Sequence, residues 1–422
     1  MKIVLQRPAY ADELTAPTSK SAAHRALIAA AFADEKTELV LRTSCEDIEA
    51  TVRCLVALGA TIERTREGLT VTPVARENIK KNAVLDCGES GSTLRFLLPV
   101  CAALGANATF LRRGRLPQRP LSPLKEELEA HGLRVLEDGA ALKTSGRIAN
   151  GEYRIAANVS SQYITGLLFA LSLLDLPSSL TLTGAVESAP YIDMTVDTLA
   201  CFGAVPRKEN NRFLIGGMLE AKLRSPKKLT PEGDFSGAAF PLALGAIGTH
   251  AVTVKGLSLP SLQGDSEILS LLLQFGARIE YKKAAVTVYP SPLKGIDIDA
   301  RQIPDLVPIL AVIATAAQGT TCITGAERLR LKESDRLAAT TAFLSTLGGD
   351  IKETADGLVI LGGKPLHGGT VDVCGDHRIA MSAAVAALLT DDPVVIEHAE
   401  CVHKSYPDFF KEAVFGTAQE QL

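Results

Sequence analysis

The chain has 422 residues, enough for two or three ordinary domains, and 46% of them are hydrophobic. Its 44 basic and 48 acidic residues give a net charge of −4. This argues against a nucleic-acid partner, because nucleic-acid-binding proteins usually carry a basic excess. The eight cysteines show no C-x-x-C spacing, and no window supplies the roughly 18 apolar residues of a membrane span. We therefore expect a soluble, reduced, cytoplasmic protein without a targeting segment or a membrane partner.

A helix–hairpin pattern recurs along the chain at intervals of 71 to 73 residues. Each copy has a helical stretch, usually begun by an acid, then a glycine suited to a helix C-cap and a β-hairpin. The glycines are Gly59, Gly132, Gly203, Gly276 and Gly348, and the acids are Asp47, Asp193, Asp265 and Asp335. A shortened sixth copy, residues 406–416, lacks its hairpin. The N-terminal strand at residues 2–6 is expected to complete it.

A second segment of each copy is apolar on nearly all sides, which predicts a buried helix. These segments are residues 21–32, 92–105, 160–174, 237–248, 306–319 and 378–389. We predict an α/β fold with helices inside and sheets outside. Six units suggest two domains of three repeats each: residues 15–228, and residues 1–14 with 229–422. The connections at 15–20 and 225–234 are the expected crossings.

Polar residues cluster at the start of each buried helix. Ser, Thr and Asp fit ordinary helix caps, but cations at a helix start oppose the helix dipole unless an anion lies beyond them. Such cations are Lys20, Arg25, Arg95 and Arg378. The sequence "SGST" at 90–93 resembles a phosphate-binding loop, although it is not a Walker A motif. We predict an anion-binding site where these helix starts converge.

Two further cationic segments fit either a binding site or solvated surface. "RRGRLPQRP" contains Arg112, Arg113, Arg115 and Arg119, and "LKESDR" contains Lys332, Glu333, Asp335 and Arg336. In the second segment, Glu333 could exchange protons beside phosphate-binding cations. Lys404 occupies the equivalent place in the sixth copy. No spacing typical of metal ligands is present, and we expect no cofactor.

Taken together, the motifs closely resemble the 5-enolpyruvylshikimate-3-phosphate synthase family of enolpyruvyl transferases, over essentially the whole chain. The motifs that carry the resemblance, in order, are "SKSAAHRAL", "CGESGSTLR", "LPQRPL", "SSQYITGLL", "ESAPYIDMT", "IPDLVPILA", "LKESDRL", "GDHRIAM" and "HKSYPD". The resemblance implies a monomer with two inside-out α/β domains of three βαβαββ units. It also implies an active site in the interdomain cleft.

The resemblance further implies transfer of the enolpyruvyl group of phosphoenolpyruvate to the 5-hydroxyl of shikimate 3-phosphate, with release of phosphate. The implied catalytic residues are Asp305, Glu333 and Lys20. Shikimate 3-phosphate would be bound by Lys20, Ser21, Arg25, Ser160, Ser161, Gln162, Ser188, Asp305 and Lys332, with Tyr191 nearby. Phosphoenolpyruvate would be bound by Lys20, Gly91, Arg95, Arg119, Gln162, Arg336, Arg378 and Lys404. Within the reaction, Asp305 would take the proton from the hydroxyl and Glu333 would protonate the methylene carbon.

Two residues depart from the family pattern. Glu89 stands where many members have Asn, and Arg328 lies near a position that is Asn in some, so neither receives a role. Glyphosate, the family's inhibitor, would bind beside Gly91. The main alternative is the related transferase acting on UDP-N-acetylglucosamine, but the loop "RRGRLPQRP" lacks the Cys of that enzyme. The other is a non-catalytic anion- or RNA-binding protein on the same repeat, which the net charge and the retained acid and base disfavour.

Overall fold

The computed structural model describes residues 1–216 and 223–419. Backbone contacts divide the chain into two units, Met1–Ser19 with Glu232–Leu422 and Lys20–Pro231. We call these the first unit and the second unit. The boundaries expected from the sequence lie a few residues away. Residues 217–222 and 420–422, which fall inside the expected domains, lie outside the described residues.

One repeat of the second unit illustrates the architecture. Its elements are β6 (Ala83–Gly88), α3 (Gly91–Leu104), β7 (Ala108–Arg112), α4 (Leu124–Ala130), β8 (Leu133–Asp138) and β9 (Ala141–Gly146). The sheet order is β6-β7-β9-β8, with β6 parallel to β7 and the other neighbours antiparallel. A parallel pair needs a helical crossover and the antiparallel pair needs only a short turn, so the order βαβαββ follows.

Two similar repeats complete the second unit. One contains α1 (Lys20–Ala31), β3 (Thr37–Val40), α2 (Glu46–Leu58), β4 (Thr61–Thr65), β5 (Gly68–Thr72) and β14 (Lys228–Leu229). The other contains β10 (Glu152–Ala156), α5 (Ser161–Ser172), β11 (Ser178–Thr183), α6 (Ala189–Cys201), β12 (Arg207–Glu209) and β13 (Arg212–Ile215). The short 3-10 helices η1 (Arg76–Asn78) and η2 (Leu116–Gln118) lie in connections.

The first unit has the same plan. Its first repeat contains β2 (Glu13–Thr15), α7 (Phe235–Ile247), β15 (Val252–Lys255), η3 (Gly264–Glu267), α8 (Ile268–Phe275), β16 (Arg278–Lys282) and β17 (Ala285–Tyr289). The second contains β18 (Asp297–Asp299), η4 (Pro304–Leu306), α9 (Val307–Ala316), β19 (Gly319–Thr324), η5 (Glu327–Leu331), α10 (Arg336–Thr346), β20 (Asp350–Glu353) and β21 (Leu358–Gly362). The third contains β22 (Gly369–Asp372), α11 (His377–Ala386), η6 (Ala387–Leu389), β23 (Val394–Glu397), η7 (Ala399–Lys404), α12 (Phe409–Glu412), β24 (Val414–Gln419) and β1 (Lys2–Tyr10).

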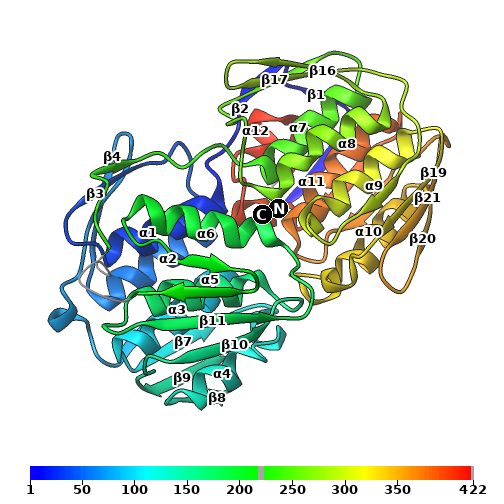
Figure 1. Cartoon of the computed structure of the whole chain (residues 1–422). Helices are drawn as coiled ribbons and strands as arrows, with labels where there is room; N and C mark the ends of the chain where they lie inside the picture. Colours follow the sequence, from blue (N-terminus) through cyan, green and yellow to red (C-terminus); the bar gives the residue numbers. More distant parts are fainter. Residues whose placement is uncertain (217–222, 420–422) are drawn as a thin grey trace. The chain divides into compact units, whose positions relative to one another are not determined.

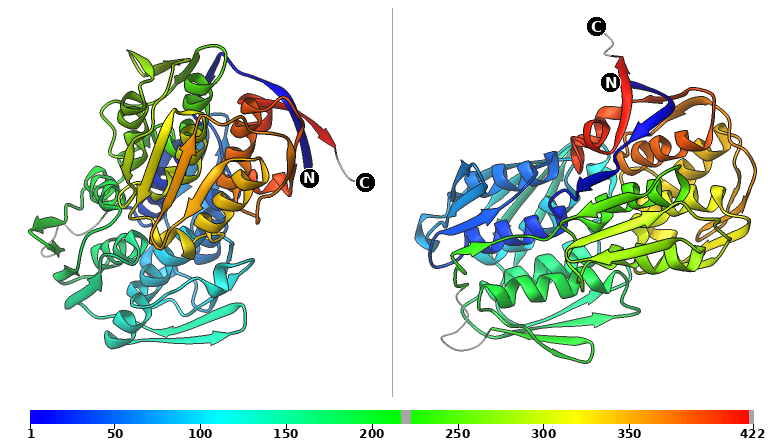
Figure 2. Two further views of the ribbon diagram at one scale, coloured as in Figure 1. Left: turned by 90° about the vertical axis from the view of Figure 1, so that its right-hand side faces the viewer. Right: turned by 90° about the horizontal axis from the view of Figure 1, so that it is seen from above.

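The two chain ends share the last of these sheets. Its order is β22-β23-β1-β24, so the N-terminal strand pairs on one side with β23 and on the other with the C-terminal strand. Figure 2 shows the blue and red strands side by side. The prediction that the N-terminal strand completes the sixth repeat is confirmed. The hairpin that the sequence lacks is replaced by β1 and β24, which come from opposite ends of the chain.

The helices predicted to be buried form the two cores, with the sheets outside them (Figure 1). The α/β fold class with helices inside is thereby confirmed. Helices α3 and α5 pack closely because Gly166 of α5 lacks a side chain. A Cβ there would stand 2.3 Å from the carbonyl oxygen of Arg95. Among the described residues, no helix is long and apolar enough to cross a membrane.

The predicted C-cap glycines are also confirmed. All five adopt positive φ, from 78° at Gly203 to 117° at Gly59, where glycine pays no steric penalty. The acids are less regular. Asp335 caps α10 by accepting a hydrogen bond from the amide of Ala338, and Asp47 lies in the first turn of α2. Asp193 does not begin a helix as expected, because α6 already starts at Ala189.

Candidate active site

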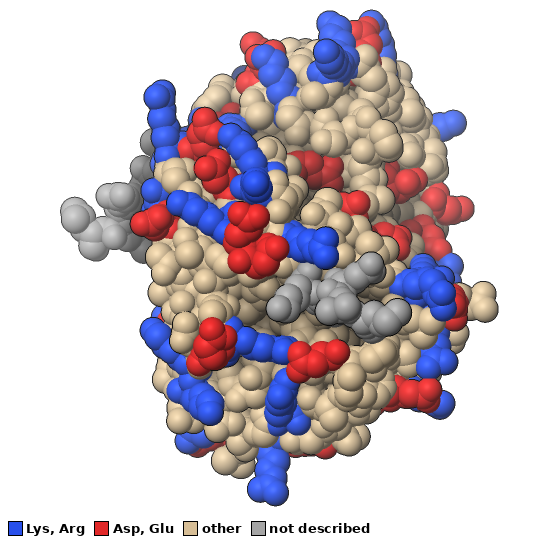
Figure 3. Space-filling view, turned by 60° about the vertical axis from the view of Figure 1, so that its left-hand side comes forward, with Lys and Arg blue, Asp and Glu red and all other residues tan. Residues whose placement is uncertain are grey.

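Each unit gathers polar residues at the N-terminal ends of its buried helices. In the first unit we call this group the carboxylate cluster: Asp305, Lys332, Glu333, Arg336, Asp376 and Arg378. In the second unit we call it the hydroxyl cluster: Lys20, Ser90, Ser92, Arg95, Ser160 and Gln162. On the face in Figure 3, Lys and Arg side chains are interspersed with Asp and Glu.

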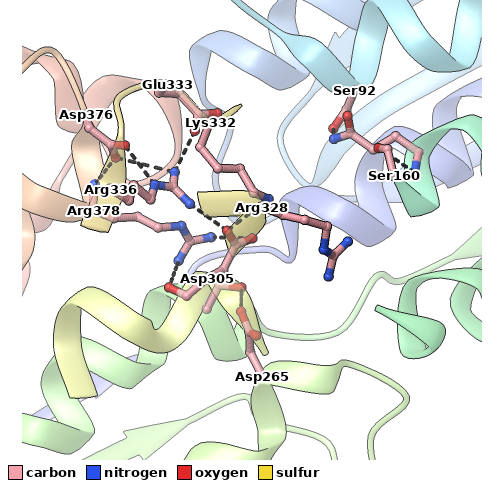
Figure 4. A network of polar contacts seen from close by, with 12 residues as sticks. Ser92, Ser160, Asp265, Asp305, Arg328, Lys332, Glu333, Arg336, Asp376 and Arg378 are labelled. Atoms are coloured by element: carbon pink, nitrogen blue, oxygen red, sulfur yellow. Dashed lines mark hydrogen bonds and ion pairs between the residues drawn. The ribbon is translucent and has the colours of Figure 1, made fainter. Parts of the chain in front are cut away.

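Arg336, the first residue of α10, is the centre of the carboxylate cluster (Figure 4). Its side chain is 2% exposed and contacts three carboxylates: Asp305 at 2.6 Å, Glu333 at 2.7 Å and Asp376 at 2.7 Å. Burial would lower the pKa of Arg336, but the three negative charges outweigh burial and raise it. The guanidinium therefore stays charged and joins the predicted acid and base through one group.

Asp305 lies in η4, one turn before α9, and three cations face its carboxylate. Besides Arg336, these are Arg378 at 3.3 Å and Lys332 at 3.5 Å. Burial alone would raise the pKa of Asp305. The charges of Arg378, Lys332 and Arg336 outweigh burial and hold the pKa well below its usual range. Asp305 is therefore ionised and able to accept a proton.

Asp376 and Arg378 explain why a cation stands at the start of α11. Asp376 is the N-cap and accepts a hydrogen bond from the amide of Arg378 at 3.0 Å. The Arg378 side chain turns to Asp305, donating also to the carbonyl oxygen of that residue at 3.2 Å. The negative groups around the helix start thus offset the charge of Arg378.

Lys332 has a perturbed pKa. Burial is the largest influence and lowers its pKa to about 8, against the opposing attraction of Asp305. The residue follows η5 directly, so the short 3-10 helix places it beside Glu333 and the start of α10. Lys404, the other expected cation of this unit, is buried at the end of η7. Arg328, which received no role, donates to the carbonyl oxygen of Arg301 at 3.0 Å.

In the hydroxyl cluster, two serines cap buried helices. Ser90 Oγ accepts from the amide of Thr93 at 3.3 Å at the start of α3, and Ser160 Oγ accepts from the amide of Gln162 at 3.3 Å at the start of α5. Gln162 links both helices. Its Oε1 accepts from Arg95 at 2.7 Å and its Nε2 donates to Ser92 at 2.9 Å. Two helix N-termini, with neutral caps and a cation between them, form an environment suited to anions.

Lys20 and Arg25 are held by different partners on α1. Lys20 begins the helix, and its Nζ lies 2.8 Å from the carboxylate of Asp47 on α2. The buried Arg25 makes four hydrogen bonds, to Thr195, Thr165, and the carbonyl oxygens of Ser21 and Tyr191. Burial lowers the pKa of Arg25 to about 10. Arg25 thus ties α1 to α5 and α6, while Lys20 stands at the helix end.

Gly91 and Arg119 are in close contact. A Cβ on Gly91 would stand 2.8 Å from Nη1 of Arg119, so the guanidinium lies against the bare backbone at the start of α3. The carboxylate of Glu89 lies over Gly114, where a Cβ would meet it at 2.2 Å. Glu89 is exposed and is directed at the loop after β7.

The remaining predicted residues lie near helix starts. Ser21 is the second residue of α1, Ser161 is the first of α5 and Tyr191 is in the first turn of α6. Ser188 is the N-cap of α6 with a left-handed φ of 54°. Few non-glycine residues adopt this conformation, and those that do are often at functional sites.

The arginine-rich loop divides into structural and candidate site residues. Arg112 is buried and donates to the carbonyl oxygens of Ala140 and Gly139. Arg113 pairs with Asp86 at 2.8 Å on the surface. Arg112 and Arg113 thus have structural partners, and Arg119 lies against Gly91 at the start of α3.

Sequence reasoning missed the roles of two acids. Asp47 holds Lys20, and Asp265 in η3 accepts a hydrogen bond from Ser236 in the first turn of α7. Asp265 is buried, and its Oδ1 finds no hydrogen-bond partner among the described residues. Burial and the charge of Asp305 raise its pKa to about 7. Both acids occupy the same place in their repeats, so the repeat period could have predicted that each holds the start of the preceding buried helix.

Solved structures define the class of the protein. Enolpyruvyl transferase NikO from Streptomyces tendae has the same fold, with a TM-score of 0.76 over 99% of each chain at 17% identity. EPSP synthase from Acinetobacter baumannii matches with a TM-score of 0.81 over 99% of each chain at 27% identity. The fold is therefore the one shared by enolpyruvyl transferases. Among the described residues, no group of three or more His, Cys, Asp or Glu side chains could hold a metal ion.

Sequence comparisons narrow the class to a family. The family model described as EPSP synthase (3-phosphoshikimate 1-carboxyvinyltransferase) matches residues 6–413. The 3-phosphoshikimate 1-carboxyvinyltransferase of Clostridium kluyveri is 41% identical over 98% of this chain and 96% of its own length. That of Clostridium novyi is 40% identical over 95% and 94%. The chain belongs to the EPSP synthase family.

Proposed function

We propose that this chain transfers the enolpyruvyl group of phosphoenolpyruvate to the 5-hydroxyl of shikimate 3-phosphate and releases phosphate. Membership of the family supports the reaction, and one observation supports the residue roles. Asp305 and Glu333, the proposed base and acid, are both bound by Arg336, at 2.6 and 2.7 Å. Two carboxylates held by one cation can exchange protons with a substrate in turn.

The proposed reaction has two steps. In the addition step, the 5-hydroxyl oxygen bonds to the central carbon of phosphoenolpyruvate. Asp305 takes the hydroxyl proton, and Glu333 gives a proton to the methylene carbon, which becomes a methyl group. In the elimination step, Glu333 takes a proton from the new methyl group, the carbon–oxygen bond to phosphate breaks, and the departing phosphate takes the proton held by Asp305. The enolpyruvyl double bond is thereby restored on the shikimate oxygen.

The charges around Asp305 suit these two reaction steps. In the structure, Arg378, Lys332 and Arg336 keep the pKa of Asp305 well below its usual range, so Asp305 is ionised but a weak base. Phosphate and carboxylate groups of the substrates would share these cations. The positive field at Asp305 would then weaken, and its pKa would rise. Binding of the anionic substrates would therefore make Asp305 a stronger base when a hydroxyl is present to lose its proton.

The proposed binding residues are those that the family resemblance implies. Shikimate 3-phosphate would contact Lys20, Ser21, Arg25, Ser160, Ser161, Gln162, Ser188, Asp305 and Lys332. Phosphoenolpyruvate would contact Lys20, Gly91, Arg95, Arg119, Gln162, Arg336, Arg378 and Lys404. The family also supports a cytoplasmic monomer that glyphosate inhibits by occupying the phosphoenolpyruvate site beside Gly91.

The test is phosphate release from phosphoenolpyruvate with shikimate 3-phosphate, run beside the same assay with UDP-N-acetylglucosamine. We expect release with the shikimate substrate alone. In Glu333→Gln, kcat should fall by about 10²- to 10⁴-fold, the range for loss of a general acid. The control Asp138→Asn alters an exposed carboxylate paired with Lys143 and should keep full activity. Release only with the sugar nucleotide would overturn the proposal, and full activity of Glu333→Gln would overturn the role of Glu333.

A further inference from the structure

A chain of buried hydrogen bonds runs across three helices of the second unit. His24 Nδ1 on α1 lies 2.7 Å from Thr51 Oγ1 on α2, and Thr51 Oγ1 lies 2.7 Å from Thr93 Oγ1 on α3. Thr93 Oγ1 then donates to Ser90 Oγ, the N-cap of α3, at 2.8 Å. All four side chains are at most 1% exposed. In such an environment, a hydrogen-bond chain is strong and a break in it is costly.

The direction of the chain follows from the state of His24. Burial lowers the pKa of His24 to about 3, so the imidazole is neutral and carries one proton. Its Nε2 has no hydrogen-bond partner among the described residues. A buried N–H without an acceptor is rarer and costlier than an unused lone pair, which places the proton on Nδ1. His24 therefore donates to Thr51, Thr51 donates to Thr93, and Thr93 donates to Ser90.

This direction determines whether the Ser90 hydroxyl donates or accepts each of its hydrogen bonds. Its Oγ accepts both the hydroxyl proton and the amide proton of Thr93, at 2.8 and 3.3 Å. Both lone pairs of the Ser90 oxygen are then in use, and its own proton is left to act as a donor. The next residue is Gly91, a proposed phosphoenolpyruvate contact, against which Arg119 lies. The chain thus ends at the first turn of α3, where an anion is expected.

We propose that His24 and Thr51 are positioning residues for phosphoenolpyruvate: through Thr93 they hold Ser90 and the first turn of α3 in place to bind its anionic groups. This inference rests on the proposed function. The same helix face of α2 also carries Asp47, four residues before Thr51, which holds Lys20 at 2.8 Å. A single helix therefore aligns the cation at the start of α1 with the cap at the start of α3.

The test compares Thr51→Val, which keeps the shape of the side chain but removes the hydroxyl, with Thr51→Ser, which keeps the hydroxyl. We expect Thr51→Val to raise the KM for phosphoenolpyruvate about tenfold, the size of one lost hydrogen bond. The KM for shikimate 3-phosphate should change less than about twofold, and Thr51→Ser should stay close to wild type. The matched control is Thr144→Val, a buried threonine of the same unit that bonds the backbone of Ala108 far from the cap in sequence.

A second substitution tests that the effect travels along the chain. Thr93→Val breaks the next link, so the double variant with Thr51→Val should raise the KM for phosphoenolpyruvate no more than the more severe single variant. Multiplied effects of the two changes would contradict transmission through one chain. Equal changes in both KM values, or failure of Thr51→Ser to restore the wild-type KM, would show a general structural role and overturn the inference.

A measurement that needs no activity separates this inference from the proposed function. Nitrogen-15 NMR of the whole chain should show His24 neutral between pH 5 and pH 8, with its proton on Nδ1, and the Nδ1 signal should shift in Thr51→Val. A proton on Nε2 would reverse the direction of the hydrogen bonds from His24 to Ser90. It would overturn the inference even in an active enzyme. If His24 has the expected tautomer but the protein has no transferase activity, the result would count against the proposed function alone.

Discussion

The two clusters differ in how their helix starts are capped. In the hydroxyl cluster, the caps of α3 and α5 are the neutral residues Ser90 and Ser160. In the carboxylate cluster, the cap of α11 is the acid Asp376, and the acid Asp335 caps α10, which begins with Arg336. A serine satisfies the helix amides but leaves the positive helix end to attract an anion. An aspartate cancels much of that attraction.

The difference indicates a division of labour. The carboxylate cluster attracts anions with side-chain cations, whose charges also set the pKa of Asp305. It is suited to moving protons. The hydroxyl cluster combines the cations Lys20 and Arg95 with helix ends and with hydroxyl and amide groups that do not titrate over the physiological pH range. It is suited to holding substrates. The same repeat therefore supports two kinds of chemistry through a change in the capping residue.

The strongest test of this comparison is the stability cost of losing a cap in each cluster. Asparagine can still cap a helix, so Asp376→Asn mainly removes one of the three negative partners of the buried Arg336. Breaking a buried ion pair costs about 3–5 kcal/mol of the free energy of unfolding. Ser160→Ala removes a neutral cap and should cost about 1 kcal/mol. Urea unfolding measures both, and equal losses would contradict the distinction between the clusters.

A smaller effect is expected from Gly91→Ala in the hydroxyl cluster. The added methyl group would stand 2.8 Å from Nη1 of Arg119, so the guanidinium must move away from the start of α3. We expect the KM for phosphoenolpyruvate to rise about tenfold, the effect of one weakened charged contact. The inhibition constant for glyphosate should rise more. The control is Gly151→Ala, whose methyl group would be 3.8 Å from its nearest neighbour, His131. A wild-type enzyme unaffected by millimolar glyphosate would contradict the proposed inhibitor site.

The smallest expected effect is a pH dependence that belongs to the carboxylate cluster. Lys332 has a pKa of about 8, and the charged groups around it are Asp305, Arg336, Glu333 and Arg328. As pH rises through this value, Lys332 loses its charge. The kcat/KM for shikimate 3-phosphate should then fall a few-fold by about pH 8.5. Lys332→Arg stays protonated and should abolish this alkaline limb. If Lys332→Arg keeps the alkaline fall in kcat/KM, that fall belongs to another titrating group.

The pH dependence that Lys332 gives to folding stability is opposite in sign to the pH dependence that it gives to activity. The pKa of Lys332 in the folded state is below the ordinary value of 10.5, so the unfolded chain binds more protons between about pH 8 and that value. The contribution of Lys332 to stability therefore rises with pH across this window. Activity that falls while the unfolding midpoint holds or rises would separate loss of binding from loss of structure.

The repeat could be predicted from the sequence because it depends on local features such as helix caps and glycines. The C-cap at Gly59 and the helix start at Asp335 depend on a few neighbouring residues, and both were predicted correctly. The failure at Asp193 was also local: α6 begins at Ala189, and the signals that mark this start are Ser188 at the N-cap and Pro190 in the first turn. Arg112 was grouped with the candidate anion-binding arginines, although its donors go to backbone carbonyls 27 and 28 residues away.

By itself, the sequence determined the α/β repeat, the buried helices and the residue types at their starts, because helical period, caps and glycines act within a few residues. It also carried the family motifs. Only the tertiary structure decided which charges meet. Arg336 contacts Asp376 across 40 residues of sequence, and His24 reaches Ser90 through hydroxyls on two other helices. Such pairings depend on how whole helices pack against each other. They set the pKa of Asp305 and the polarity of Ser90, and no local pattern encodes them.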